Sequence, residues 1–155
     1  MKAADRRMQL LETAAQCFAE HGYRGTTTAM LAKQAGISEP ILYRHFANKQ
    51  DLFVALIESV GKAVLTEWRS AVRNASSPLE QLRIILNRNP ATADPTTQYV
   101  YRILFHASTE LTEPQIQQAI REHYASYVRY IAGIIKKAQD AGEIRRDPPP
   151  PATAP

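Results

Sequence analysis

The side chains with the clearest chemical capacity lie between positions 27 and 53. Arg44 carries paired N–H donors that match the O6 and N7 acceptors of guanine, and Glu39 can accept a hydrogen bond from the amine of cytosine. The hydroxyls, imidazole and ammonium around them suit phosphate oxygens. The residues predicted to contact a nucleic acid are Thr28, Ser38, Glu39, Pro40, Tyr43, Arg44, His45 and Lys49. Taken singly, Tyr43 could be a packing aromatic and Lys49 a solvated charge, but their joint placement favours the interpretation as a DNA contact.

Two short helices, about 26–34 and 38–46, are expected to hold these side chains. Ala32 lets the helices cross closely, Gly36 can take a positive φ in the turn, and Leu42 fills the angle between them. The spacing of four residues from Ala32 to Gly36, and of six from Gly36 to Leu42, is typical of a helix-turn-helix. The face of the second helix that carries Arg44 is then left for the major groove.

The rest of the chain is predicted to be helical as well. Only 6 of the 155 residues are glycine, and helix-favouring side chains dominate between the prolines. Helices are expected over about 6–21, 49–74, 78 onward, 97–109 and 114–142, the last with a single apolar face. The predicted fold class is all-α, with a three-helix DNA-binding domain at 1–48, a helical ligand-sensing and dimerisation domain at 49–146, and a Pro-rich disordered tail at 147–155.

Charge and composition narrow the class of partner. The net charge is +4, and the first fifty residues hold seven Lys and Arg against four acidic residues, so a polyanion should meet the N-terminal third. A single cysteine excludes a disulfide framework or a cysteine-based metal site. No apolar run is long enough to span a bilayer, and the first residues do not form a signal peptide. We therefore expect a cytoplasmic protein with no membrane role, no metal and no cofactor.

An effector pocket is predicted in the second domain, with apolar walls and a few polar anchors. Arg102 and His106 lie four residues apart on one helix face and are the best polar candidates, because such groups are rarely buried without a partner. The alternative is that the aromatic residues are simply core. The residues predicted to line the pocket are Trp68, Tyr99, Arg102, Phe105, His106, Tyr124 and Tyr127.

Two other classes of function compete with DNA binding. An enzyme could use Cys17 and His21, which share a helix face, as a nucleophile pair. The core pattern of the first helix favours a buried, inert Cys17 instead, so we do not expect an enzyme. The second alternative is a helical protein-interaction module, or a truncated regulator, without independent DNA binding; the intact set of DNA-facing residues argues against it.

The N-terminal part of the chain resembles the tetracycline-repressor (TetR) family. The resemblance covers about residues 6–60 and rests on 18–23 (FAEHGY), 35–38 (AGIS), 42–46 (LYRHF) and 48–53 (NKQDLF). It implies a homodimer that binds a palindromic operator, usually as a repressor. It also implies a small-molecule pocket among the C-terminal helices, whose occupation tilts the fourth helix and moves the two recognition helices out of register with successive major grooves.

The sequence departs from that family in two places. Glu39 and Pro40 stand where many relatives have a basic, polar or small residue, which leaves the base preference open. Relatives usually continue with two long helices after a segment like 142–147, and those helices build the dimer; here residues 148–151 are prolines. We therefore expect the 155-residue chain to be a weak dimer or an association-prone monomer.

Overall fold

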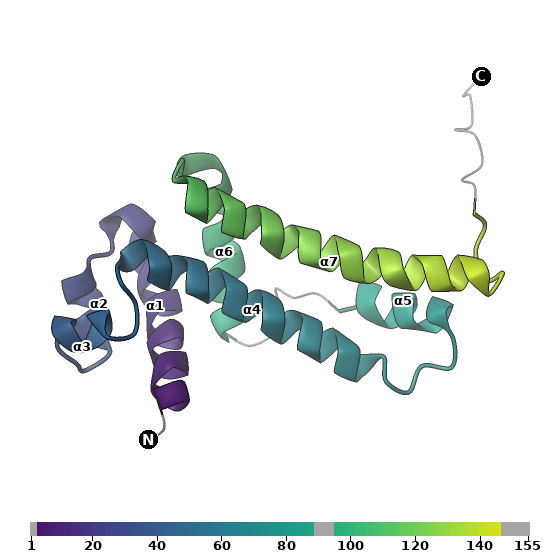
Figure 1. Ribbon diagram of the computed structural model, residues 1–155, viewed down its shortest axis with the longest axis horizontal. Helices are drawn as coiled ribbons and strands as arrows, with labels where there is room; N and C mark the ends of the chain where they lie inside the picture. Colours follow the sequence, from purple (N-terminus) through teal and green to yellow (C-terminus); the bar gives the residue numbers. More distant parts are fainter. Residues whose placement is uncertain (1–2, 89–94, 147–155) are drawn as a thin grey trace.

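The computed structural model describes residues 3–88 and 95–146, and within them helices are the regular secondary structure (Figure 1). They are α1 (Ala3–Gly25), α2 (Thr28–Gln34), α3 (Glu39–Tyr43), α4 (Lys49–Ala71), α5 (Pro78–Leu86), α6 (Pro95–Glu110) and α7 (Pro114–Asp140). The predicted all-α class is confirmed. The predicted tail at 147–155, and most of the predicted loop around 89–95, lie outside the described residues.

The helices form a small head and a longer body. Helices α1, α2 and α3 gather at one end of the molecule, and α4 leads away from them (Figure 1). Helix α7 runs beside α4 along the body, and α5 packs against α7. Helix α6 packs on α1 and, to a smaller extent, on α4. The body therefore contacts the head through α6 and through α4.

The head has an aromatic centre that α1 and α4 build together. Phe18 and Phe53 are almost fully buried and pack edge to face, with ring centroids 5.0 Å apart. Tyr23 contacts both rings: it is tilted against Phe53 with ring centroids 4.9 Å apart, and it stacks on Phe18 at 5.9 Å. Aromatic packing of this kind adds to the free energy gained by burying the rings. The start of α4 is therefore part of the head and not only of the body.

The ends of the helices follow local rules in most places. Gly22 has φ 70°, the left-handed cap that the sequence predicts for the first helix, although one more turn follows it before Gly25. Asn48 caps α4 as predicted, because its Oδ1 accepts from the Asp51 backbone N–H at 2.8 Å. Helix α4 ends at Ala71, three residues before the predicted end.

The apolar face of α7 is rotated slightly from the predicted one. Ile116, Ile120, Tyr127 and Ile134 are buried as expected. Tyr124, which the sequence placed on the buried face, is 44% exposed, and His123 is buried instead. The residues that the model describes include no helix with the length and apolar character needed to cross a membrane.

Candidate functional site

The turn between α2 and α3 has the geometry that the glycine predicts. Gly36 has φ 66°, and its N–H donates to the Lys33 carbonyl at 3.1 Å. The N–H of Ile37 donates to the Ala32 carbonyl at 3.0 Å, which closes the turn. Ala32 and Leu42 are both buried where the helices cross. A side chain larger than glycine at position 36 would be strained at this φ.

Helix α3 is shorter than predicted, and its outer side is open to solvent. It ends at Tyr43, so Arg44 is the C-cap residue and His45 lies in the following turn. Ser38, Pro40, Tyr43 and Arg44 are exposed, and Glu39 and His45 are half-buried. Leu42 and Phe46 point inward as the spacing predicts. The side of α3 predicted to face DNA is therefore accessible along its length.

A hydrogen-bond network joins α2 to α3 at the edge of this surface. The Tyr43 hydroxyl donates to Thr28 Oγ1 at 3.2 Å, and the Thr28 hydroxyl donates to Glu39 Oε2 at 2.7 Å. The three side chains fix one another's orientation. Each of the two hydroxyls already donates its one hydrogen within this network, so it would have to turn to donate to a phosphate. The Glu39 carboxylate also puts a negative charge on a surface that would face phosphates.

Lys49 has an internal role that the sequence reasoning missed. Its Nζ donates to the backbone carbonyls of Tyr23 and Thr26, both at 2.8 Å, and lies 4.5 Å from the centre of the Tyr23 ring. Burial lowers the pKa of this ammonium, while Glu113 nearby opposes the shift. The side chain thus ties the end of α1 to the start of α4. No local pattern in the sequence could have indicated these two carbonyls as partners.

Comparisons with known proteins establish the family of this chain. The family model described as "Bacterial regulatory proteins, tetR family" matches residues 10–56. The nucleoid occlusion factor SlmA of Marinomonas sp. (strain MWYL1) is 33% identical over 135 residues, which cover 78% of this chain and 68% of that protein. The chain belongs to the TetR family. As a member of that family it is a DNA-binding transcriptional regulator.

Other relatives of this TetR-family chain extend the similarity into the body. The transcriptional repressor AcnR of Corynebacterium efficiens is 28% identical over 149 residues, covering 96% of this chain and 73% of that protein. The structure of the regulator FadR from Bacillus subtilis in complex with stearoyl-CoA superposes with a TM-score of 0.72 at 23% identity, covering 92% of this chain and 75% of FadR. The fold of the body is therefore that of TetR-family regulators too.

In the body of this TetR-family chain, four of the predicted pocket residues form two groups, and Tyr124 is exposed on α7. Trp68 and Tyr127 are buried together, with ring centroids 5.1 Å apart, and the Tyr101 hydroxyl donates to the Tyr127 hydroxyl at 2.8 Å. Tyr99 and Arg102 form a separate pair, with the guanidinium 5.6 Å from the ring centre. The single pocket that the sequence predicts is therefore divided, because neighbouring α6 residues point in different directions. The side chains of Phe105 and His106 lie outside the described residues.

His123 joins the first group, and the sequence analysis did not identify it. It is 5% exposed, and its ring packs against Tyr101 and Tyr127 at centroid distances of 5.6 Å and 4.7 Å. Within the described residues neither ring nitrogen makes a hydrogen bond of normal geometry, and the same holds for Trp68 Nε1. Burial lowers the pKa of His123, with the backbone of Ile57 acting in the opposite direction. Buried polar atoms without partners are unusual, and a ligand is one way to satisfy them.

The cysteine does not have the surroundings of a nucleophile. Cys17 is fully buried, and burial raises the pKa of its thiol, which disfavours the thiolate that a nucleophile requires. His21 is exposed, with Nε2 3.8 Å from Glu20 Oε2. Among the described residues no group of three His, Cys, Asp or Glu side chains could hold a metal ion.

Proposed function

We propose that this TetR-family regulator binds a palindromic operator as a homodimer, with residues 1–48 reading the DNA and 49–146 sensing an effector and dimerising. The exposed side of α3 on a well-defined turn is the observation that carries the proposal. On binding, the hydroxyls of Thr28 and Tyr43 would turn from their present partners toward phosphate oxygens, and Arg44 would read a base. The residues proposed to contact DNA are Thr28, Ser38, Glu39, Pro40, Tyr43, Arg44, His45 and Lys49.

The proposed effector is a small molecule with an apolar body and at least one polar group. It would occupy the region between α4, α6 and α7 where Trp68, His123 and Tyr127 meet. The orphaned ring nitrogens of Trp68 and His123 support this site, because a polar ligand atom would satisfy them. The likeness to FadR, whose structure holds stearoyl-CoA, supports an apolar ligand of this kind. Binding would favour a state in which the two α3 helices no longer match successive major grooves.

Selection of bound sequences from random duplex DNA by the purified 155-residue chain tests the operator proposal. We expect enrichment of an inverted repeat whose half-sites lie one or more helical turns apart, at about 34 Å per turn. Arg129→Gln, on α7 and away from α3, is the control for the loss of one arginine and should enrich the same repeat. Recovery of random sequence, or of a single half-site without symmetry, would contradict the proposal.

Release of the selected DNA by candidate ligands tests the effector proposal. Stearoyl-CoA is the first probe, with free coenzyme A as the control that lacks the apolar body. We expect the probe to weaken DNA binding by the natural chain and to have less effect on His123→Leu, which keeps the volume but removes the ring nitrogens. Equal release from both proteins would show that the α4–α6–α7 cluster is not the effector site.

A further inference from the structure

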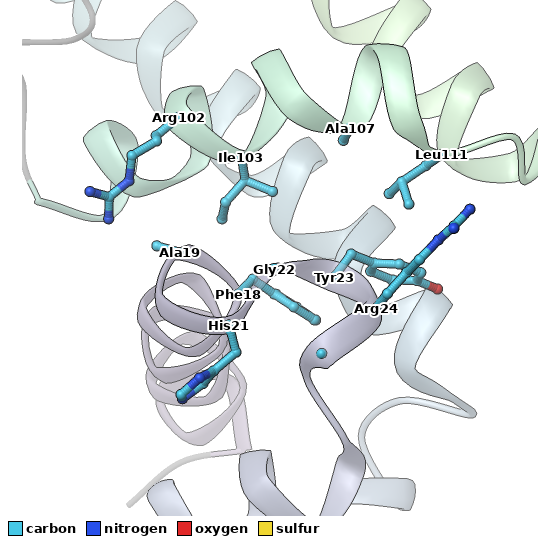
Figure 2. A pocket seen from close by; sticks show the side chains of 11 residues that line it. Phe18, Ala19, His21, Gly22, Tyr23, Arg24, Arg102, Ile103, Ala107 and Leu111 are labelled. Atoms are coloured by element: carbon cyan, nitrogen blue, oxygen red, sulfur yellow. The ribbon is translucent and has the colours of Figure 1, made fainter.

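A cavity of about 410 Å³ lies between the C-terminal end of α1 and helix α6, away from the Trp68 and His123 cluster (Figure 2). Its volume is within the range of small-molecule sites. Phe18 from α1, Ile103 and Ala107 from α6, and Leu111 directly after α6 give it apolar walls. The cavity thus lies at the contact between the head and the body of the molecule.

Two arginines from different helices flank these apolar walls. Arg24 extends from the last turn of α1 and Arg102 from α6, and Figure 2 shows them at opposite sides of the apolar side chains. No aspartate or glutamate is among the described residues that line the cavity. Two carboxylates act from outside the lining: Glu20 Oε2 lies 3.8 Å from His21 Nε2, and the Glu113 charge adds to the burial that raises the pKa of Tyr23. The lining itself is therefore apolar with a positive rim.

We propose that this cavity binds a small organic anion with an apolar body, such as an aromatic sulfonate or carboxylate. The body would lie against Phe18, Ile103 and Leu111, where its burial is favourable. A guanidinium offers parallel N–H donors that match the geometry of a carboxylate or sulfonate, so Arg102 would hold the anionic group. The site differs from the proposed effector site in place and in the charge of its lining.

Binding here would act on DNA affinity through the end of α1. Tyr23 lines the cavity, and its carbonyl accepts the hydrogen bond from Lys49 that ties α1 to α4. The turn that carries Tyr23 follows the left-handed Gly22, a joint that can change the direction of the chain. A ligand pressing on this turn therefore shifts the junction that positions the head. This coupling rests on the proposed DNA-binding function, whereas binding of the anion does not.

Fluorescence titration of the full chain with 1-anilinonaphthalene-8-sulfonate tests the binding step. N-phenyl-1-naphthylamine, which has the same ring system without the sulfonate, is the neutral comparison. We expect Arg102→Gln to weaken sulfonate binding about tenfold, as for the loss of a charge-assisted hydrogen bond, and to leave binding of the neutral dye unchanged. Arg129→Gln is the matched control, because Arg129 lies on α7 beside the exposed Val128. If the sulfonate binds the α7 surface around Val128 instead, Arg129→Gln will weaken its binding and Arg102→Gln will not. That result would overturn the proposal.

Filling the cavity gives a second, independent test. Ala19 lines the cavity from α1 and is half-buried, so a phenylalanine at this position can enter the space without disturbing the centre of the head. We expect Ala19→Phe to abolish the binding of both dyes at this site while the circular dichroism spectrum and melting temperature stay close to those of the natural chain. Undiminished binding of the sulfonate to a folded Ala19→Phe protein would refute the site.

The coupling to DNA is tested separately, on the selected duplex. We expect the sulfonate to change the DNA affinity of the natural chain and not that of Ala19→Phe. If the chain binds the sulfonate in the cavity but binds no DNA, the site stands and the operator proposal fails. If both bind independently, the coupling is wrong.

Discussion

At the scale of single residues, Arg44 is the side chain on which base preference should depend. It is exposed at the end of α3, whereas Tyr43 is already hydrogen-bonded to Thr28 at the rim. We expect Arg44→Ala to relax the preference at one base pair in each half-site, a loss of about 1–3 kcal/mol of discrimination. Tyr43→Phe should weaken binding to all sequences alike, because a phosphate contact reads no base. If Arg44→Ala selects the same consensus from random duplex DNA as the natural chain, a side chain other than Arg44 reads that base pair.

The buried His123 should make the stability of the fold depend on pH. Burial lowers its pKa in the folded chain below the ordinary value of 6.5, so the unfolded chain binds this proton more readily. Above pH 6.5 both states hold a neutral ring and His123 adds no pH dependence. Between pH 6.5 and the lower pKa of His123 in the folded chain, the unfolded chain takes up this proton and the folded chain does not. The free energy of unfolding therefore falls as the pH falls through this interval. Urea unfolding between pH 7.5 and 5 measures this.

The control for this titration is His123→Leu, which has no proton to gain at that position. We expect its unfolding free energy to vary less with pH than that of the natural chain over the same interval. The two curves should separate below pH 6.5 and run parallel above it. Parallel curves throughout would mean that His123 titrates alike in both states.

At the scale of helices, the junction between α1 and α4 depends on Lys49. Its ammonium donates to the Tyr23 and Thr26 carbonyls, so Lys49→Met leaves carbonyls at the end of α1 without that donor. We expect a loss of about 2 kcal/mol of unfolding free energy, measured by urea denaturation. Lys33→Met on the exposed side of α2 is the control and should leave stability close to that of the natural chain. Weaker DNA binding by Lys49→Met at unchanged stability would instead support a direct phosphate contact.

The features that could be predicted from the sequence are those that local chemistry decides. The left-handed Gly22 and Gly36, and the Asn48 cap, depend on residues a few positions apart. The carbonyl partners of Lys49 lie 23 and 26 positions away, and only the packing of α4 on α1 brings them together. The burial of His123 in place of Tyr124 on α7 was missed for the same reason. The rotation of a helix about its axis is set by the helices that it packs against.

At the scale of the whole molecule, an exposed apolar stripe on α7 is the surface best suited to self-association. Tyr124, Val128 and Ile135 are 44%, 65% and 36% exposed, and their spacing puts them on one face of the helix. Contiguous exposed apolar side chains of this kind mark interaction surfaces. The stripe belongs to the body and not to the head (Figure 1), so pairing through it would leave both α3 helices accessible.

A palindromic operator requires two α3 helices about 34 Å apart, so two copies of the chain must associate. The stripe consists of three exposed apolar side chains on one helix face, whereas each partner in a stable interface buries roughly 800 Å² and about 20–30 residues. We therefore expect a weak dimer, which Val128→Glu converts to a monomer because a carboxylate would lose its hydration in the interface. Gln118→Glu, an exposed change near the start of α7, is the control and should leave association unchanged. Analytical ultracentrifugation across a concentration series measures both, and a dimer that persists at nanomolar protein in Val128→Glu would show that another surface joins the two copies.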